Sequence, residues 1–134
     1  MALDVRRAAI ADIDALMPLV SGYRNFYRQR ADEQRERAFI TQHLANGTSV
    51  VFIAWNAARA VGFIQLFPTF STVYLGPGLI LEDLYVEPDA RGAGVATRLL
   101  DVANAYAREI GAVGMFLETA MDNTTAQRVY ERNG

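Results

Sequence analysis

The chain has 134 residues, of which 51% are hydrophobic, and it carries a formal charge of −2 with an isoelectric point near 5.3. This length is typical of one domain with a single core, and the slightly acidic balance excludes a global basic field that would bind nucleic acid or an anionic membrane. No apolar run reaches the roughly 20 residues of a membrane span, so we expect one domain over residues 1–134, in the cytoplasm, with neither a nucleic-acid nor a membrane partner.

Hydrophobic periodicity divides the chain into alternating helices and strands. Residues 3–8 alternate like a short strand, and two helices are predicted over 11–23 and 32–47, the second ending at Asn46-Gly47. The remaining predicted elements are strands 49–55 and 61–67 joined by the turn 56–60, a loop over 71–78, strand 79–87, helix 94–110, strand 113–120 and helix 122–134.

The order of these elements, β α α β β β α β α, predicts the fold class. Strands 49–55 and 61–67 form an antiparallel hairpin, whereas strands 79–87 and 113–120 flank a helix and are therefore expected to be parallel. The sequence thus predicts an α/β, or α+β, domain with a mixed sheet.

Several residue types are missing or rare, and this limits the chemistry. The chain has no cysteine and all 13 of its basic residues are arginine, which excludes thiol nucleophiles, cysteine zinc sites and Schiff bases. The single histidine, His43, lies near the end of a predicted helix, where it complements the helix dipole. We therefore expect no metal site.

A glycine-rich turn, RGAGVA at residues 91–96, joins a predicted strand to a predicted helix. The first turn of a helix has free main-chain N–H groups, and the small residues Gly92 and Gly94 let an anion approach them. Such a turn suits a diphosphate, although a plain strand-to-helix connection would need the same glycines for its dihedral angles.

Two adjacent acids, Glu82 and Asp83, interrupt the apolar run of strand 79–87. Consecutive strand residues face opposite sides of a sheet, so we expect that the two carboxyl groups cannot share a proton. Their apolar neighbours favour a partly buried functional acid over two solvated positions at a strand end.

The stretches LYVEPDARGAGVATRLL and TAMDNTTAQRVYERNG resemble the cofactor motif and the closing motif of the GNAT N-acetyltransferase superfamily. Its signature is matched in place by Arg91, Gly94 and Ala96. Within the superfamily, LEDLYV is most similar to the diamine, polyamine and related small-amine acetyltransferases. The resemblance implies a mostly antiparallel sheet with helices on both faces.

The resemblance also implies acetyl-CoA as cosubstrate, without a metal. The pantetheine arm would lie in a gap between the fourth and fifth strands, and the diphosphate would lie on main-chain amides of the glycine turn. The implied cofactor-binding residues are Leu84, Tyr85, Val86, Arg91, Gly92, Ala93, Gly94, Val95, Ala96 and Asn123.

Catalytic roles follow from the resemblance together with the chemistry of amines. An alkylamine has a pKa near 10.4, so it arrives protonated, and we expect Glu82 to be the base that removes the proton. Tyr130 is expected to protonate the leaving thiolate; without the motif, it would be interpreted as a core tyrosine. Asp83 and Tyr27 are expected to bind the acceptor. For the segment that contains Tyr27, residues 23–37, the alternation of arginines and acids favours the alternative of a solvated helix end.

We therefore expect an N-acetyltransferase that acts on a small-molecule primary amine of the polyamine, diamine or amino-acid-like kind. The alternatives are a lysine acetyltransferase acting on proteins, histones included, and a non-catalytic acetyl-CoA-binding module. Members of the superfamily usually continue for one or two strands past the tyrosine-bearing helix. We therefore expect either a longer gene product or a homodimer in which a neighbour covers the edge of strand 113–120.

Overall fold

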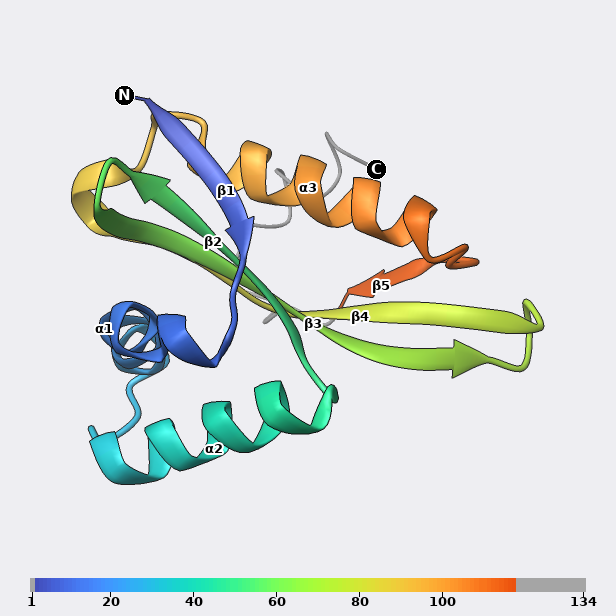
Figure 1. Cartoon of the computed structure of the whole chain (residues 1–134), viewed down its shortest axis with the longest axis horizontal. Helices are drawn as coiled ribbons and strands as arrows, with labels where there is room; N and C mark the ends of the chain where they lie inside the picture. Colours follow the sequence, from blue (N-terminus) through green and yellow to red (C-terminus); the bar gives the residue numbers. More distant parts are fainter. Residues whose placement is uncertain (1, 118–134) are drawn as a thin grey trace.

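The computed structural model describes residues 2–117, and within them it contains a five-stranded sheet with the strand order β1-β2-β3-β4-β5 (Figure 1). Neighbouring strands are antiparallel except for β4 and β5, which are parallel. The mixed, mostly antiparallel sheet predicted from the sequence is confirmed. The strands are β1 (Leu3–Arg7), β2 (Val50–Asn56), β3 (Arg59–Ser71), β4 (Gly76–Val86) and β5 (Met115–Leu117).

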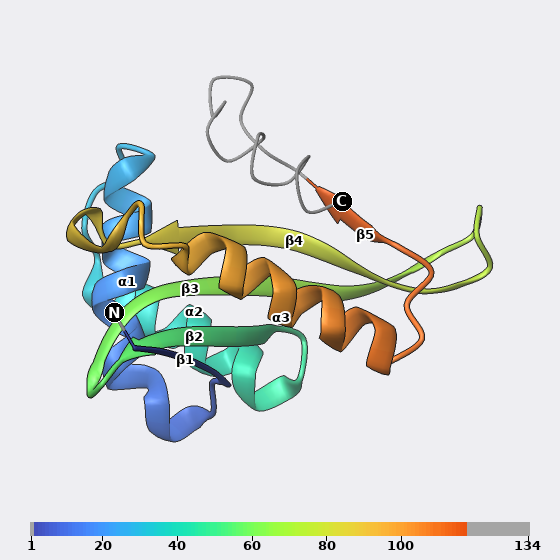
Figure 2. The ribbon, with the colours of Figure 1, turned by 90° about the horizontal axis from the view of Figure 1, so that it is seen from above.

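Three α-helices of the described region cover the two faces of the sheet: α1 (Ile13–Phe26), α2 (Glu33–Asn46) and α3 (Val95–Glu109). Figure 2 shows α3 on one face and α1 with α2 on the other. Short 3₁₀ turns precede α1 (Ile10–Asp12) and follow β4 (Pro88–Ala90). The predicted helix over residues 122–134 lies outside the described residues.

Each face of the sheet has its own hydrophobic core. On the α3 face, Leu66, Leu81 and Leu99 are fully buried, and on the other face Leu16, Ile53 and Phe63 play the same part. Gly62 of β3 lets α3 pack closely, because an added Cβ would lie 3.0 Å from the side chain of Val95 at the start of that helix. The sheet therefore fixes the beginning of α3 relative to β4.

The ends of α2 follow the chemistry predicted for helix termini. The Asp32 side chain caps the helix by accepting a hydrogen bond from the Arg35 amide at 3.2 Å. Gly47 ends the helix in a left-handed conformation with φ = 68°, as the Asn46-Gly47 pair predicts.

Both hairpins extend further than the sequence predicts. The turn between β2 and β3 is only Ala57-Ala58, and the predicted loop over 71–78 is paired strand except at residues 72–75. The loop prediction is confirmed at residues 72–75 and wrong at residues 71 and 76–78, which are paired strand. Gly78 is instead needed for packing, since an added Cβ would lie 2.7 Å from the Phe116 ring.

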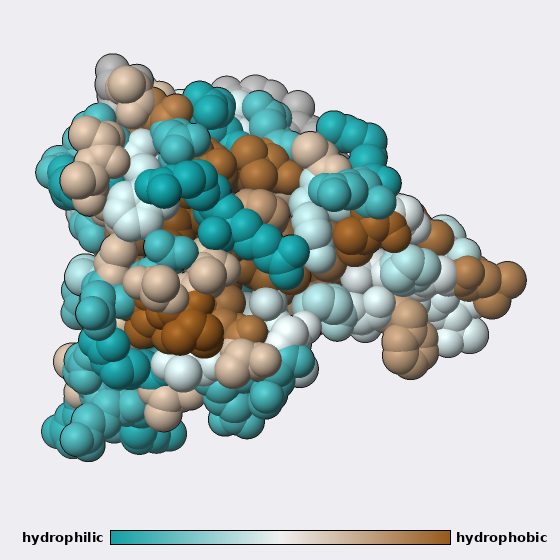
Figure 3. All heavy atoms as spheres, viewed as in Figure 1, coloured by the Kyte–Doolittle hydropathy of each residue, from teal (hydrophilic) through white to brown (hydrophobic). Residues whose placement is uncertain are grey.

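The tip of the β3–β4 hairpin projects beyond the rest of the fold and is apolar. Phe70, Val73, Tyr74 and Leu75 are exposed there, and Figure 3 shows hydrophobic residues at this end of the molecule. Among residues 2–117, β5 forms one edge of the sheet. In the same part of the chain, no helix is long and apolar enough to cross a membrane.

A bulge interrupts the pairing of β3 with β4 at the acid pair. Gln65 pairs with Asp83 and Leu66 pairs with Leu81, so Glu82 is an extra residue without a counterpart in the register. A bulge shifts the alternation of side chains by one position. Leu81 therefore lies on the α3 face, while Glu82 and Asp83 both lie on the face covered by α1 and α2.

Candidate active site

A cavity of about 580 Å³ lies between α1 and α2 on one side and β3 and β4 on the other. Its apolar wall consists of Val20, Ala38, Phe39, Ile40, Phe63 and Phe67. The cavity also contains ionisable groups from both sides, namely Arg24, Asp32, Arg35, Glu36, Glu82 and Asp83. An apolar enclosure with a few converging polar groups is the usual form of a small-molecule site.

The acids Glu82 and Asp83 both line this cavity. The expectation that they face opposite sides of the sheet was wrong, because the bulge at Glu82 turns both toward α1 and α2. The argument from alternation against a shared proton therefore no longer applies. The fold instead brings two carboxyl groups to the same wall.

Asp83 is a mostly buried carboxyl group that meets only neutral partners among residues 2–117. The Gln65 amide nitrogen donates a hydrogen bond to it, and the Tyr23 hydroxyl also interacts with it. Burial raises the pKa of Asp83, and the two neutral donors only partly oppose this effect. A cation placed in the cavity would therefore stabilise the ionised form of Asp83.

An aromatic group from α1 covers the acid pair. The Tyr23 hydroxyl donates to the main-chain oxygen of Glu82 at 3.4 Å, and burial next to Asp83 raises the pKa of this tyrosine, which therefore stays protonated. The Tyr27 ring packs edge-on against Tyr23, with 5.0 Å between centroids. Tyr27 itself does not line the cavity, so its contact with the site passes through Tyr23.

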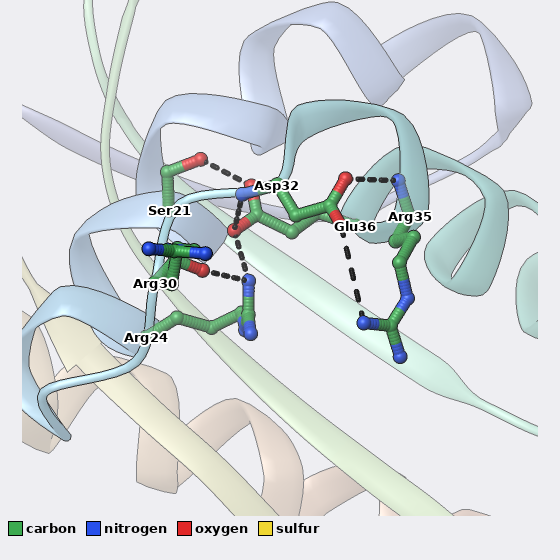
Figure 4. A network of polar contacts seen from close by, with 6 residues as sticks. All are labelled: Ser21, Arg24, Arg30, Asp32, Arg35 and Glu36. Carbon is green, nitrogen blue, oxygen red and sulfur yellow. Dashed lines mark hydrogen bonds and ion pairs between the residues drawn. The ribbon is translucent and has the colours of Figure 1, made fainter.

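The opposite wall holds a second buried acid, Glu36 of α2, which is only 5% exposed. Its carboxylate accepts hydrogen bonds from the Ser21 hydroxyl at 2.7 Å and from Arg24 at 2.5 Å, as Figure 4 shows. It also accepts a longer one, of 3.4 Å, from the main-chain amide of Asp32. Burial alone would raise the pKa of Glu36, but these donors together lower it.

This network overturns part of the interpretation of residues 23–37 as a solvated helix end. Glu33 and Arg37 do form an exposed ion pair at 2.9 Å, as that interpretation predicts. Arg24 and Glu36 instead join α1 to α2 at the cavity wall, and Arg24 also donates to the Arg30 carbonyl at 3.1 Å. The connection between the two helices is thus tied to the site.

The glycine turn and the first turn of α3 have the features of an anion site. Gly92 and Gly94 have φ angles of 84° and 80°, and added Cβ atoms would meet nothing within 4 Å among residues 2–117, so within this part of the chain the approach to the main chain is open. In the described part of the chain no side chain caps α3, and the first turn of this helix carries no acid that would compete for the free N–H groups. Residues 91–96 therefore suit a diphosphate.

The Arg91 side chain turns back toward the sheet. Its Nε donates to the Val86 carbonyl at 2.9 Å, and its guanidinium carbon lies 5.6 Å from the centre of the Tyr85 ring. The resemblance implies that Arg91 belongs to the cofactor-binding residues. In the structure this side chain mainly connects the turn to the end of β4.

The end of β4 has a strand on one side only within the described residues. Leu84, Tyr85 and Val86 pair with β3, whereas the pairing with β5 covers Leu79 to Leu81. Main-chain groups on the second side can therefore serve a ligand that lies beside the strand. This position continues directly into the glycine turn. Tyr130 and Asn123, the other residues expected in this region, lie outside the described residues.

Sequence reasoning gave no role in the site to several polar residues of the cavity wall, among them Tyr23, Arg24, Glu36 and Gln65. Only Gln65 carried a usable signal, because it is a single polar residue within the apolar strand stretch VGFIQLF. A polar side chain at such a position requires a partner, and the structure supplies Ser49 and Asp83. The other three depend on how α1 packs against α2 and β4.

Comparisons with known proteins agree with this arrangement. The family model for the acetyltransferase (GNAT) family matches residues 13–134. An uncharacterised N-acetyltransferase of Bacillus subtilis (strain 168), YhfO, is 42% identical over 132 residues, which cover 98% of this chain and 89% of that protein.

Solved structures agree as well. The crystal structure of a probable acetyltransferase is 38% identical with a TM-score of 0.93, covering 98% of this chain and 88% of that one. A predicted acetyltransferase from Clostridium acetobutylicum, solved with acetyl-CoA, shares the fold with a TM-score of 0.81 at 20% identity, over 99% of this chain and 89% of that one. The chain therefore belongs to the GNAT acetyltransferase family and is an acetyl-CoA-dependent acetyltransferase.

Proposed function

We propose that the protein transfers the acetyl group of acetyl-CoA to the primary amine of a small molecule that binds in the cavity between α1, α2, β3 and β4. One observation carries this proposal. Asp83 is a mostly buried carboxyl group that has only neutral partners among residues 2–117, and it lies beside Glu82 in a cavity that also has an apolar wall. Such a site favours a cation with a carbon body.

The two acids take different roles in this proposal. Asp83 binds the ammonium group of the acceptor, because a cation offsets the burial that disfavours its charge. Glu82 removes one proton from the ammonium group, and the neutral nitrogen then attacks the thioester carbonyl. A C–N bond forms, the C–S bond breaks, and the thiolate leaves with a proton that we assign to Tyr130. The attacking nitrogen then loses its second proton, which restores Tyr130, and the proton held by Glu82 passes to solvent.

Acetyl-CoA is assigned to the side of the end of β4 that does not pair with β3. Its diphosphate is expected on the main-chain amides of residues 91–96, where Gly92 and Gly94 leave the approach open. Its pantetheine arm is expected beside Leu84, Tyr85 and Val86. Arg91 ties these two parts together through its hydrogen bond to Val86. Asn123 is assigned to the pantetheine as well.

Release of CoA thiol in the presence of an amine panel tests this proposal. Glu82→Gln is expected to lower kcat by about 10²-fold while leaving acetyl-CoA affinity unchanged, because it removes the base and keeps the shape. Asp83→Asn is expected to raise KM for the amine by about tenfold to 100-fold, through loss of a hydrogen bond between charged groups.

Glu109→Gln is the matched control, since Glu109 is an exposed acid at the end of α3 on the other face of the sheet. Turnover of Glu82→Gln within about threefold of the parent across pH 6 to 9 would show that Glu82 is not the base. Absence of thiol release with every amine, in a protein that binds acetyl-CoA, would favour a non-catalytic module. Release with lysine-containing peptides alone would favour a protein acetyltransferase.

A further inference from the structure

A chain of buried polar groups leads from Ser49 through Gln65 to Asp83, and Gln65 lines the cavity together with Asp83. Ser49, just before β2, is 3% exposed, and Gln65 of β3 is 2% exposed. The Ser49 hydroxyl donates to Gln65 Oε1 at 2.6 Å, and Gln65 Nε2 donates to Asp83 Oδ2. Burying a serine and a glutamine between apolar residues is unfavourable unless each is hydrogen-bonded, and here both are.

The direction of this chain is fixed. An amide side chain can turn either its oxygen or its nitrogen toward a neighbour. An ionised Asp83 carboxyl group can only accept, so the nitrogen of Gln65 faces it, and Oε1 accepts from the Ser49 hydroxyl. The opposite orientation would place the amide oxygen against a carboxylate oxygen, with no hydrogen between them.

We propose that Ser49 and Gln65 are positioning residues that hold the Asp83 carboxylate toward the acceptor and stabilise its charge without neutralising it. This inference rests on the proposed function, in which Asp83 binds the acceptor ammonium. Glu36, on the opposite wall of the cavity, provides the contrast. Arg24 neutralises that acid, so it has no charge left to offer a cationic ligand.

The other charged groups around Asp83 do not replace the glutamine. From α1, the neutral Tyr23 hydroxyl reaches Asp83, while Arg24 is held by Glu36. Arg35 of α2 and its partner Asp32, which caps this helix, lie 3.9 Å apart, and β4 contributes the acid Glu82. Burial raises the pKa of Asp83, and the Gln65 hydrogen bond lowers it, so removing this bond should raise the pKa further.

Two variants of the full chain test the inference. Gln65→Met keeps the length of the side chain and removes the donor, and Ser49→Ala, the milder change, removes only the group that orients the amide. The titration midpoint of the Asp83 carboxyl carbon, followed by ¹³C NMR without ligand, is expected to rise by about one pH unit in Gln65→Met and by less in Ser49→Ala, which keeps the amide donor. Ser49→Thr retains a hydroxyl and is expected to restore the parent midpoint.

Gln42→Met is the matched control, because Gln42 also lines the cavity but makes no hydrogen bond with Asp83 in the described part of the chain. Its Asp83 midpoint is expected to match the parent. A second readout is KM for the amine as a function of pH. In Gln65→Met and Ser49→Ala, the pH below which KM rises should move up together with the NMR midpoint.

The outcomes separate the two proposals. An Asp83 midpoint that is the same in the parent, Gln65→Met and Ser49→Ala would overturn the positioning role. A midpoint that rises while KM keeps its parent pH dependence would confirm that Ser49 and Gln65 hold Asp83, and would overturn the assignment of Asp83 to the acceptor. Movement of both readouts supports both proposals.

Discussion

Removing the charge of Glu36 and removing the charge of Asp83 should change the free energy of unfolding in opposite directions. Glu36→Gln removes a carboxylate that accepts hydrogen bonds from Ser21 and Arg24 at 2.7 and 2.5 Å. Breaking a fully buried ion pair costs roughly 3–5 kcal/mol, and Arg24, whose side chain is 32% exposed, recovers part of this through water. We expect a loss of about 2–3 kcal/mol, or a fall in Tm of about 6–12 °C.

At neutral pH, Asp83→Asn should not lower the free energy of unfolding as Glu36→Gln does. The ionised Asp83 is disfavoured by burial and has no cationic partner among residues 2–117, whereas asparagine has no charge to bury and can still accept from Gln65. The variant is therefore expected to be as stable as the parent, or more stable by up to about 1 kcal/mol. It should at the same time lose affinity for the amine.

The pH dependence distinguishes the two acids further. The raised pKa of Asp83 means that the folded state binds this proton more tightly than the unfolded chain, so its contribution to stability falls as pH rises from the ordinary value of 3.8 through the raised pKa. The lowered pKa of Glu36 means the opposite. Its contribution is complete above the ordinary value of 4.5 and is lost as pH falls through the lowered pKa.

Urea unfolding at a series of pH values, followed by fluorescence of the single tryptophan, Trp55, measures both effects. The difference in unfolding free energy between parent and variant cancels the contributions of all other groups. For Asp83→Asn, parent minus variant should decrease with rising pH; for Glu36→Gln, it should increase. Equal destabilisation by the two substitutions at neutral pH, or differences that do not change with pH, would refute the reasoning.

Two glycine substitutions test the packing and the anion site. Gly22→Ala places a Cβ 2.5 Å from the Tyr85 hydroxyl oxygen, so we expect the free energy of unfolding in urea to fall by about 1–3 kcal/mol. Adding Tyr85→Phe should restore part of this stability. No recovery in the double variant would contradict this contact. Gly94→Ala strains a residue with φ = 80° at the start of α3 and should weaken acetyl-CoA binding by about tenfold in calorimetry. Gly47→Ala, with φ = 68° at the end of α2, is the matched control. It should lose a similar amount of stability but keep its affinity for acetyl-CoA. Equal losses of acetyl-CoA affinity in the two variants would show that the glycine turn has no special role.

Local patterns predicted most of the fold. The helical period of α1, α2 and α3, the Gly47 terminus and the parallel pairing of β4 with β5 all follow from residues close together in the sequence. The strand pairing of residues 76–78 was not predicted, because glycine and proline are typical of turns. In the structure, Gly78 is a strand residue that makes room for Phe116, which comes from a distant part of the chain.

The site was less predictable, because it depends on register and packing. The acids at positions 82 and 83 attract attention in the sequence, but the bulge that turns both toward one cavity arises from pairing with β3, which no local pattern shows. Glu36 looks like a solvated helical acid, and only the packing of α1 against α2 reveals that Arg24 and Ser21 bury it.

A crystal structure of the protein with CoA and an amine accepted in the turnover assay tests the central claim most directly. We expect the amine nitrogen in the cavity, within about 3.2 Å of an Asp83 carboxylate oxygen, and its carbon body against Phe63 and Phe67. CoA is expected along the end of β4, with its diphosphate on residues 91–96. An amine bound outside this cavity, or one that contacts neither Glu82 nor Asp83, would contradict the account.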